Sequence, residues 1–294
     1  MSSRVARAIR EEGWTGEVIA VHPHSIYVTD EDDEIYAIVH QPLGNGPLNL
    51  VIPADPAQVF NGLALGTSLA SNGARLGVGE AITIGLEAAA VWDPKAYAAL
   101  AADAEALDRG LAELCREMSR RAPGASLARL LPHLEDEDLP KPLEGVAHFP
   151  RSHALIGGLA ESLMQRDRKR LKVVASSLAG LGPGLTPAGD DFIAGVLLAL
   201  ALVRQQRGDA ALNEIATMLV ETAAPRTHEI SGAYLRAAHD GQVGERWHPL
   251  LDALAAGDAT QISAAAAPVL ATGETSGADM LAGFVIGIGA LLGG

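Results

Sequence analysis

The sequence has little of what several protein classes require. Cys115 is the only cysteine among 294 residues, so no disulfide can form within the chain. Aromatic residues make up 4%, the net charge is −14, and no Lys/Arg-rich block with interleaved aromatics occurs. These features argue against nucleic acid or an anionic membrane as a partner.

Long hydrophobic runs are also missing. No apolar run reaches the roughly 18 residues of a credible membrane span. The first residues, 1–14, are charged and lack the apolar core of a signal peptide. We therefore expect a cytoplasmic protein with no membrane partner.

Hydrophobic residues make up 48% of the chain, which is enough for a sizeable core. The hydrophobic period changes near residue 90. Before it, short segments rich in Val, Ile, Tyr and Thr alternate with Pro, Gly, Asn or Asp clusters, a pattern typical of strands. These predicted strands are Glu17–Val21, Ser25–Thr29, Glu34–His40, Leu48–Ile52 and Glu80–Leu86.

Alanine-rich segments of helical period follow. The predicted helices are Pro94–Arg121 as one long helix or a broken pair, Ser126–Leu131, His153–Ala179, one from Pro187, Asp209–Ala223, Arg226–His239, His248–Ala255, Ala259–Ala267 and one at the C-terminus; residues 132–150 read as a loop. We predict an α+β protein, with a small, mainly antiparallel β-sheet or barrel in residues 1–92. A larger helical domain with a central buried helix pair should occupy residues 93–294.

One glycine-rich motif stands out, Gly182-Pro-Gly-Leu-Thr-Pro-Ala-Gly-Asp-Asp-Phe-Ile-Ala-Gly195. Thr186 as N-cap with Pro187 at the first helical position predicts a helix start. Gly182 and Gly184 let a ligand approach the main chain, and the amides of a helix N-terminus attract anions. The motif is neither a Walker loop nor a dinucleotide fingerprint. A well-capped buried helix without a ligand is the alternative.

The second half of this motif returns in weaker form as Thr275-Ser-Gly-Ala-Asp-Met-Leu-Ala-Gly283. Asp191 aligns with Asp279, and the flanking glycines align in pairs, Gly189 with Gly277 and Gly195 with Gly283. An uncharged stretch follows each acid, so both helices should be buried. If the helices cross as a symmetric pair, their N-terminal turns meet. Asp190, Asp191 and Asp279 are then candidate catalytic groups.

Further polar residues belong to the predicted substrate site. Arg226 can clamp a carboxylate or phosphate, with Thr227 and Ser231 beside it on one helix face. A capped helix start with an exposed arginine is equally compatible with this segment. Ser276 and Gly277 would contribute from the second copy of the turn. Asp190 and Asp191 suit a divalent cation such as magnesium, whose identity carboxylates alone leave open.

On these residues the chain resembles a bacterial family of formerly unknown function that includes the AllH-type subunit of oxamate carbamoyltransferase. The motif 182–195, Arg226-Thr227 with Ser231, and the run Ser276-Gly-Ala-Asp279 support the resemblance, which extends over most of the chain and is looser in the N-terminal strands. His228 departs from the small polar residue expected in many relatives.

The resemblance implies a subunit of a carbamoyltransferase in allantoin-type purine nitrogen catabolism, which converts oxalurate and phosphate to oxamate and carbamoyl phosphate with other subunits. Such a transfer needs a polarised carbonyl and a stabilised phosphate rather than a covalent nucleophile. Two alternatives stay open at this point. One is a non-catalytic scaffold or regulatory subunit of that complex, and the other is a stand-alone metal-dependent hydrolase.

Overall fold

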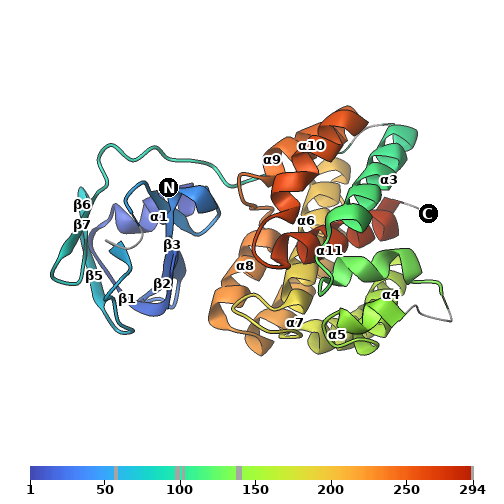
Figure 1. Ribbon diagram of the computed structural model, residues 1–294, viewed down its shortest axis with the longest axis horizontal. Coiled ribbons are helices and arrows are strands. Elements are labelled where there is room, and N and C mark those ends of the chain that lie inside the picture. The colour runs from blue at the N-terminus through green and yellow to red at the C-terminus, as the bar shows by residue number, and fades with distance from the viewer. Residues whose placement is uncertain (56–58, 97–99, 101–102, 137–140, 293–294) are drawn as a thin grey trace. The chain divides into compact units, whose positions relative to one another are not determined.

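The computed structural model describes residues 1–55, 59–96, 100, 103–136 and 141–292. The chain forms two compact units (Figure 1), one of Met1–Lys95 with Val243–Glu245 and one of Ala96–Gln242 with Arg246–Gly294. The first is a curled β-sheet and the second is helical, which confirms the predicted α+β class.

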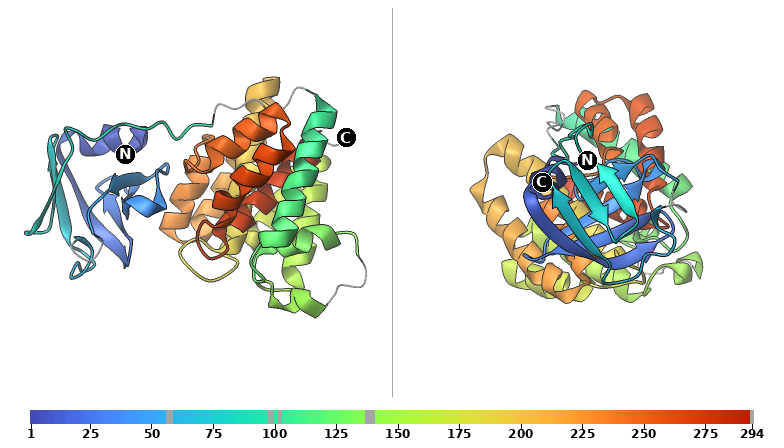
Figure 2. Two further views of the ribbon diagram at one scale, coloured as in Figure 1. Left: turned by 45° about the horizontal axis from the view of Figure 1, so that its top comes forward. Right: turned by 90° about the vertical axis from the view of Figure 1, so that its left-hand side faces the viewer.

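The N-terminal unit is built on one sheet, whose strands in the described residues follow the order β4-β3-β2-β1-β5-β6-β7. Neighbouring strands are antiparallel except for the parallel pair β3 and β4. The curvature of the sheet is visible in the right-hand view of Figure 2. The strands are β1 (Glu12–His22), β2 (Ser25–Asp30), β3 (Ile35–His40), β4 (Asn49–Ile52), β5 (Ser68–Asn72), β6 (Arg75–Val78) and β7 (Ile82–Gly85).

The core of this unit lies on the inner face of the curled sheet. The long strand β1 pairs with β2 on one side and β5 on the other, and its register shifts between Val18 and Ala20. A shift of this kind bends a strand. Helix α1 (Ser3–Ile9), capped by the Ser2 hydroxyl, buries Val5 and Ile9 in the same core.

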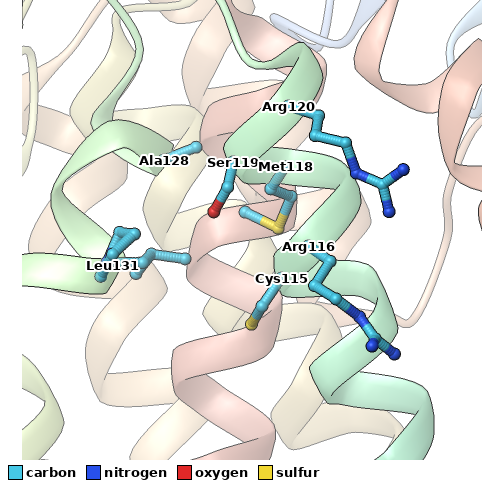
Figure 3. Close-up of a pocket in the computed structure, with 8 residues that line it drawn as sticks. Cys115, Arg116, Met118, Ser119, Arg120, Ala128 and Leu131 are labelled. Atoms are coloured by element: carbon cyan, nitrogen blue, oxygen red, sulfur yellow. The ribbon is translucent and has the colours of Figure 1, made fainter.

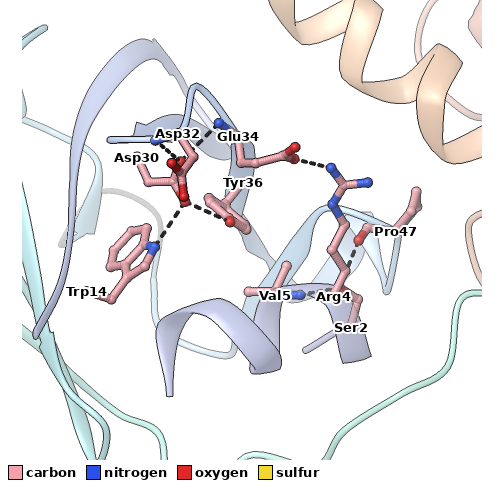
Figure 4. Close-up of polar contacts among 9 residues, drawn as sticks. All are labelled: Ser2, Arg4, Val5, Trp14, Asp30, Asp32, Glu34, Tyr36 and Pro47. Atoms are coloured by element: carbon pink, nitrogen blue, oxygen red, sulfur yellow. Dashed lines mark hydrogen bonds and ion pairs between the residues drawn. The ribbon is translucent and has the colours of Figure 1, made fainter. Parts of the chain in front are cut away.

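The β2–β3 turn is organised by one carboxylate, that of Asp30 (Figure 4). Its Oδ1 accepts the backbone N–H groups of Asp32 at 3.1 Å and Glu34 at 3.0 Å, and its Oδ2 accepts the Tyr36 hydroxyl at 2.8 Å. Trp14 donates its indole N–H to the same oxygen. Burial and the Asp30 carboxylate raise the pKa of Tyr36. This network stabilises the turn within the N-terminal unit.

The predicted strands all occur, with shifted ends, but β5, β6 and α1 were missed. β5 reads Ser-Leu-Ala-Ser-Asn, which has little β-branched character, and it forms because Leu69 is buried in the core. Pairing with the long β1 thus outweighs its weak intrinsic propensity. The histidines His22 and His24 flank Pro23 at the tight β1–β2 turn, where His22 pairs with Ser25.

The helical unit contains α3 (Ala104–Arg121), α4 (Arg151–Met164), α5 (Arg168–Leu178), α6 (Ala188–Arg207), α7 (Ala210–Ala223), α8 (Glu229–His239), α9 (Trp247–Ala256), α10 (Ala259–Leu270) and α11 (Ser276–Leu292). Short 3₁₀ segments connect some of them, η2 (Leu127–His133), η3 (Lys141–Gly145) and η4 (Ala224–Arg226). Figure 1 and the left-hand view of Figure 2 show α6 and α11 surrounded by the other helices.

Helices α6 and α11 form the predicted buried pair. Most of α6 is buried, including every residue from Phe192 to Val203. A Cβ built on Gly195 would overlap the carbonyl oxygen of Met280, and one on Gly283 would overlap that of Phe192. When Asp191 is aligned with Asp279, Gly195 aligns with Gly283 and Phe192 with Met280, so the two contacts are equivalent. The helix crossing is therefore close and approximately symmetric, and it depends on glycine in both helices.

Several helix boundaries differ from the prediction. The first long helix begins at Ala104, with Asp103 as its cap, and residues 97–99 and 101–102 of the predicted segment lie outside the described residues. The segment His153–Ala179 breaks into α4 and α5, because Arg166 adopts a φ of 53° and Asp167 caps α5. The segment at 126–131 is the 3₁₀ helix η2. Residues 137–140 of the predicted loop also lie outside the described residues.

In the part of the chain that the structure describes, no helix is both long and apolar enough to cross a membrane.

Candidate functional site

The glycine motif forms the connection between α5 and α6. Gly180, Gly182 and Gly184 all have positive φ, 71°, 118° and 94°. At Gly182 a Cβ would also lie 2.9 Å from the Ala188 nitrogen, so a side chain is excluded there by conformation and by space. Pro183 and Gly184 are exposed at the tip of this loop. The motif therefore holds the main chain in a turn that only glycine adopts readily.

The predicted cap at this helix start was wrong. Pro187 is the N-cap of α6 and makes no side-chain capping bond, and the backbone N–H groups of Asp190 and Asp191 reach the Pro187 carbonyl. Thr186 instead places its Oγ1 3.1 Å from Oγ of Ser276 in the first turn of α11. The hydroxyl thus links the two duplicated turns rather than capping its own helix.

Asp190 connects the glycine loop with the start of α8. Its side chain is buried, and its Oδ1 accepts the Gly180 N–H at 2.8 Å. Its Oδ2 accepts the hydroxyls of Thr227 and of Ser231, the latter at 2.8 Å. The predicted shared face of Thr227 and Ser231 therefore points to a carboxylate of the protein itself. Through these three donors, Asp190 links the glycine loop to the segment at the start of α8.

Asp279 has a corresponding position at the start of α11. The residue is fully buried, and its Oδ1 accepts both the Ser126 hydroxyl and the Leu127 N–H at 2.7 Å. The bonds fix the beginning of η2. Sequence reasoning did not find Ser126, which lies far from the motif and resembles an ordinary helix cap. It also caps η2 by accepting the Ala128 N–H.

Asp191 follows Asp190 in the first turn of α6. Its Oδ2 is buried and has no hydrogen-bond partner, and Oδ2 of Asp279 shares this property. The hydroxyls of Ser276 and Thr186 lie beside the Asp191 carboxyl and favour its charged form. Buried polar atoms in native proteins are nearly always paired, so these oxygens are unusual.

The two turns are close enough to interact electrostatically. Burial raises the pKa of Asp191 well above its usual range, and the charges of Asp279 and Asp190 raise it further. Burial also raises the pKa of Asp279 to about 6, against the opposing effect of the Ser126 and Thr275 hydroxyls and the Leu127 N–H. The N-terminal turns of α6 and α11 therefore meet, and both bring a carboxyl whose neutral form is favoured by burial.

The remaining predicted residues have more varied surroundings. Gly189 and Gly277 are sites of close packing, since a Cβ would overlap the carbonyl oxygens of Leu178 and Val269 respectively. Arg226 is exposed and donates from Nη1 to the Thr222 carbonyl at 2.7 Å, at the end of η4. The next residue, Thr227, donates its hydroxyl to Asp190 of the glycine motif. Arg226 therefore directly precedes a residue that contacts the motif.

The predicted cation site finds only limited support in the geometry. Within the described residues, no group of three or more His, Cys, Asp or Glu side chains is arranged to hold a metal ion. Of the two predicted cation ligands, Asp190 already accepts three hydrogen bonds, and Asp191 has the unpaired oxygen. A divalent cation at Asp190 and Asp191 stays a prediction.

Two family models match this chain. The family model described as oxamate carbamoyltransferase subunit AllH matches residues 178–288, which contain the glycine motif, the start of α8 and the duplicated turn. The model of the AllH family N-terminal domain matches residues 1–91. Searches of the curated proteins and of the solved structures found no match. The chain belongs to the AllH family.

Proposed function

We propose that this chain is a subunit of a carbamoyltransferase that acts on a small anionic amide, with oxalurate and phosphate on one side and oxamate and carbamoyl phosphate on the other. In this reaction a phosphate oxygen bonds to the carbamoyl carbon, and the bond from that carbon to the oxamate nitrogen breaks. The nitrogen takes the proton that the hydrogen phosphate gives up. The pathway would be the purine nitrogen catabolism that the family resemblance implies.

The observation that supports the proposal most strongly is the meeting of two helix N-termini around buried carboxyl oxygens. Both substrates are anions, and the positive dipole end of a helix N-terminus attracts an anion. Oxalurate and oxamate also have N–H groups, which need acceptors. The unpaired Oδ2 atoms of Asp191 and Asp279 are acceptors at the same turns.

We assign the roles accordingly. The exposed loop around Gly184, with Gly182 and the Thr186–Ser276 hydroxyl pair, would bind the anionic groups. Arg226, which is exposed, would neutralise a carboxylate or phosphate. Asp191 would orient the amide. Asp190 and Asp279, whose oxygens accept bonds from Gly180 and Leu127, would hold the turns in place.

A second candidate is a scaffold or regulatory subunit of the same complex, with the chemistry on another chain. The observation in its favour is that the hydroxyls of Thr227 and Ser231 both donate to the Asp190 carboxylate, so these polar groups are already paired within the protein. In that case the motif would stabilise the fold and would not contact substrate.

Reconstitution separates the two candidates. The chain is purified and combined with the other carbamoyltransferase subunits, and the phosphorolysis of oxalurate is measured. For a catalytic contribution we expect Asp191→Asn and Arg226→Ala to reduce kcat/KM by about tenfold to a thousandfold while the complex still assembles. Glu221→Gln, an exposed change in α7, is the matched control. Full activity of both variants would support the scaffold instead.

Thermal unfolding with added magnesium tests the proposed cation site, and an activity assay of the isolated chain tests the stand-alone hydrolase. If Asp191 binds a cation, added magnesium should raise the Tm of the parent protein and leave that of Asp191→Asn unchanged. An equal effect of magnesium on both proteins would argue against a cation at this position. Hydrolysis of oxalurate by the isolated chain would favour the stand-alone enzyme.

A further inference from the structure

A hollow outside the paired turns lies between α3 and η2 (Figure 3). Its volume is about 400 Å³, and Met118 and Ala128 form a buried apolar floor. Cys115 and Leu131, both partly buried, line its sides, and Pro132 is exposed at the edge. Leu131 and Cys115 face the same space in Figure 3. An apolar hollow of this size accepts one or two large hydrophobic side chains.

Two arginines stand at the rim of the hollow, and each is ion-paired with a glutamate. Arg116 and Arg120 follow one another by one helical turn and extend away from the floor in Figure 3. Their side chains are 63% and 62% exposed, whereas those of their acidic partners Glu113 and Glu117 are 13% and 1% exposed. The charge that reaches solvent is therefore mainly that of the arginines. The exposed arginines at this face contrast with the net charge of the whole chain, which is −14.

The hollow is also connected to the paired turns through η2. Leu131 and Pro132 belong to η2, and the first residue of η2, Leu127, donates its N–H to Asp279. Ser126 bonds to the same carboxylate oxygen. A molecule that presses on Leu131 would therefore act on the segment that Asp279 fixes.

We propose that this hollow is the docking site for another subunit of the carbamoyltransferase complex, which inserts an apolar side chain flanked by acidic residues. The inference rests on the proposed function for the existence of that complex. Apolar anchors in desolvated pockets dominate protein interfaces, and complementary charges at the rim steer association. Docking on η2 would link assembly to the position of the α11 turn.

Cys115 provides the test, because it is the only cysteine of the chain and lines the hollow. The full chain is labelled with monobromobimane, alone and mixed with the purified companion subunits, each made free of reactive cysteine. Burial raises the pKa of this thiol, so an alkaline buffer is used. We expect assembly to slow labelling of Cys115 by about tenfold or more.

Charge reversal supplies the second measurement. Arg116→Glu with Arg120→Glu should weaken binding of the companion subunits by about a hundredfold, and higher salt should weaken binding of the parent chain. Arg109→Glu is the matched control, since this arginine lies on the same helix, is 65% exposed and does not line the hollow. Circular dichroism and Tm values verify that all variants are folded.

The outcomes are distinct. A complex that forms with Cys115 fully reactive and tolerates the reversed arginines would overturn this inference and leave the proposed function intact. Failure of the parent chain to associate with any companion subunit would overturn both. If Cys115 becomes protected in the chain alone, as concentration rises and light scattering reports a dimer, the occupant is a second copy and the inference is wrong.

Discussion

At the scale of single residues, the three aspartates of the paired turns differ in what they bind. Asp190 accepts three protein hydrogen bonds, and Asp279 accepts two on one oxygen. Asp191 and Asp279 each retain a buried Oδ2 without a partner, whereas Asp190 does not. We therefore expect substitutions of adjacent aspartates in one motif to have different consequences, one for stability and one for activity.

Asp190→Ala should destabilise the helical unit. It would leave the Gly180 N–H and the Thr227 and Ser231 hydroxyls without their acceptor. Ser231 is buried, whereas Thr227 is half-buried and Gly180 is exposed, so water can replace the acceptor for the last two. A buried unpaired group costs about 1 to 3 kcal/mol, and we expect a loss of about that size in the free energy of unfolding, measured with urea. Asp252→Ala, at an exposed position in α9, is the control. Equal stability of the two variants would contradict the role of Asp190.

The raised pKa of Asp279 predicts a pH dependence of stability. The folded-state pKa is about 6 and the ordinary value is 3.8, so the folded protein binds more protons between these values. The contribution of this group is therefore largest below pH 4 and is lost as pH rises to about 6. The difference corresponds to about 3 kcal/mol.

Asp279→Asn removes this titration while keeping an acceptor for Ser126 and Leu127. The stability of the variant relative to the parent should therefore increase between pH 4 and pH 7, by up to about 3 kcal/mol. Urea unfolding of both proteins across this range measures the difference. A difference that does not change with pH would show that the Asp279 carboxyl is not perturbed.

At the scale of secondary-structure elements, the crossing of α6 and α11 brings the two turns together. The helix backbones meet where Gly195 opposes Met280 and Gly283 opposes Phe192. Because neither position has space for a methyl group, the main chains must separate if one is introduced. The geometry of the turns should therefore be sensitive to single methyl groups placed about one helical turn beyond Asp191 and Asp279.

Gly195→Ala and Gly283→Ala test this sensitivity. Overpacking typically costs about 1 to 3 kcal/mol, and backbone overlap should place both variants at the upper end or beyond it. Gly289→Ala in α11 has open space around its Cβ and should be neutral or slightly stabilising, because alanine favours helix. Thermal unfolding measures all three. A Gly195→Ala protein as stable as Gly289→Ala would contradict the close crossing.

Much of this element-level description was accessible from the sequence. The uncharged runs after Asp191 and Asp279 and the aligned glycines predicted the buried pair, since both features reflect local patterns. The partners of the aspartates were not predictable in the same way. Ser126 reaches Asp279 across 153 residues, and Thr186 bonds to Ser276 instead of capping its own helix. Such contacts depend on tertiary packing, which leaves no local signal.

At the scale of the whole molecule, membership in the AllH family and the geometry of the turns concern the same residues. The family match over 178–288 covers the loop, the Asp190 tie and the α11 turn. The charge of −14 makes long-range attraction of an anion unfavourable, so a substrate must be bound by local groups. The positive dipole ends of α6 and α11, the Arg226 side chain and the Thr186–Ser276 hydroxyl pair are such groups.

The measurement that tests the central claim most directly is a crystal structure of the protein with phosphate and oxamate bound. We predict ligand density at the exposed side of the turn from Gly182 to Asp191, with Ser276 of the second turn in hydrogen-bond contact. Density elsewhere in the protein, with both turns free of ligand and their hydroxyls still paired, would contradict the account.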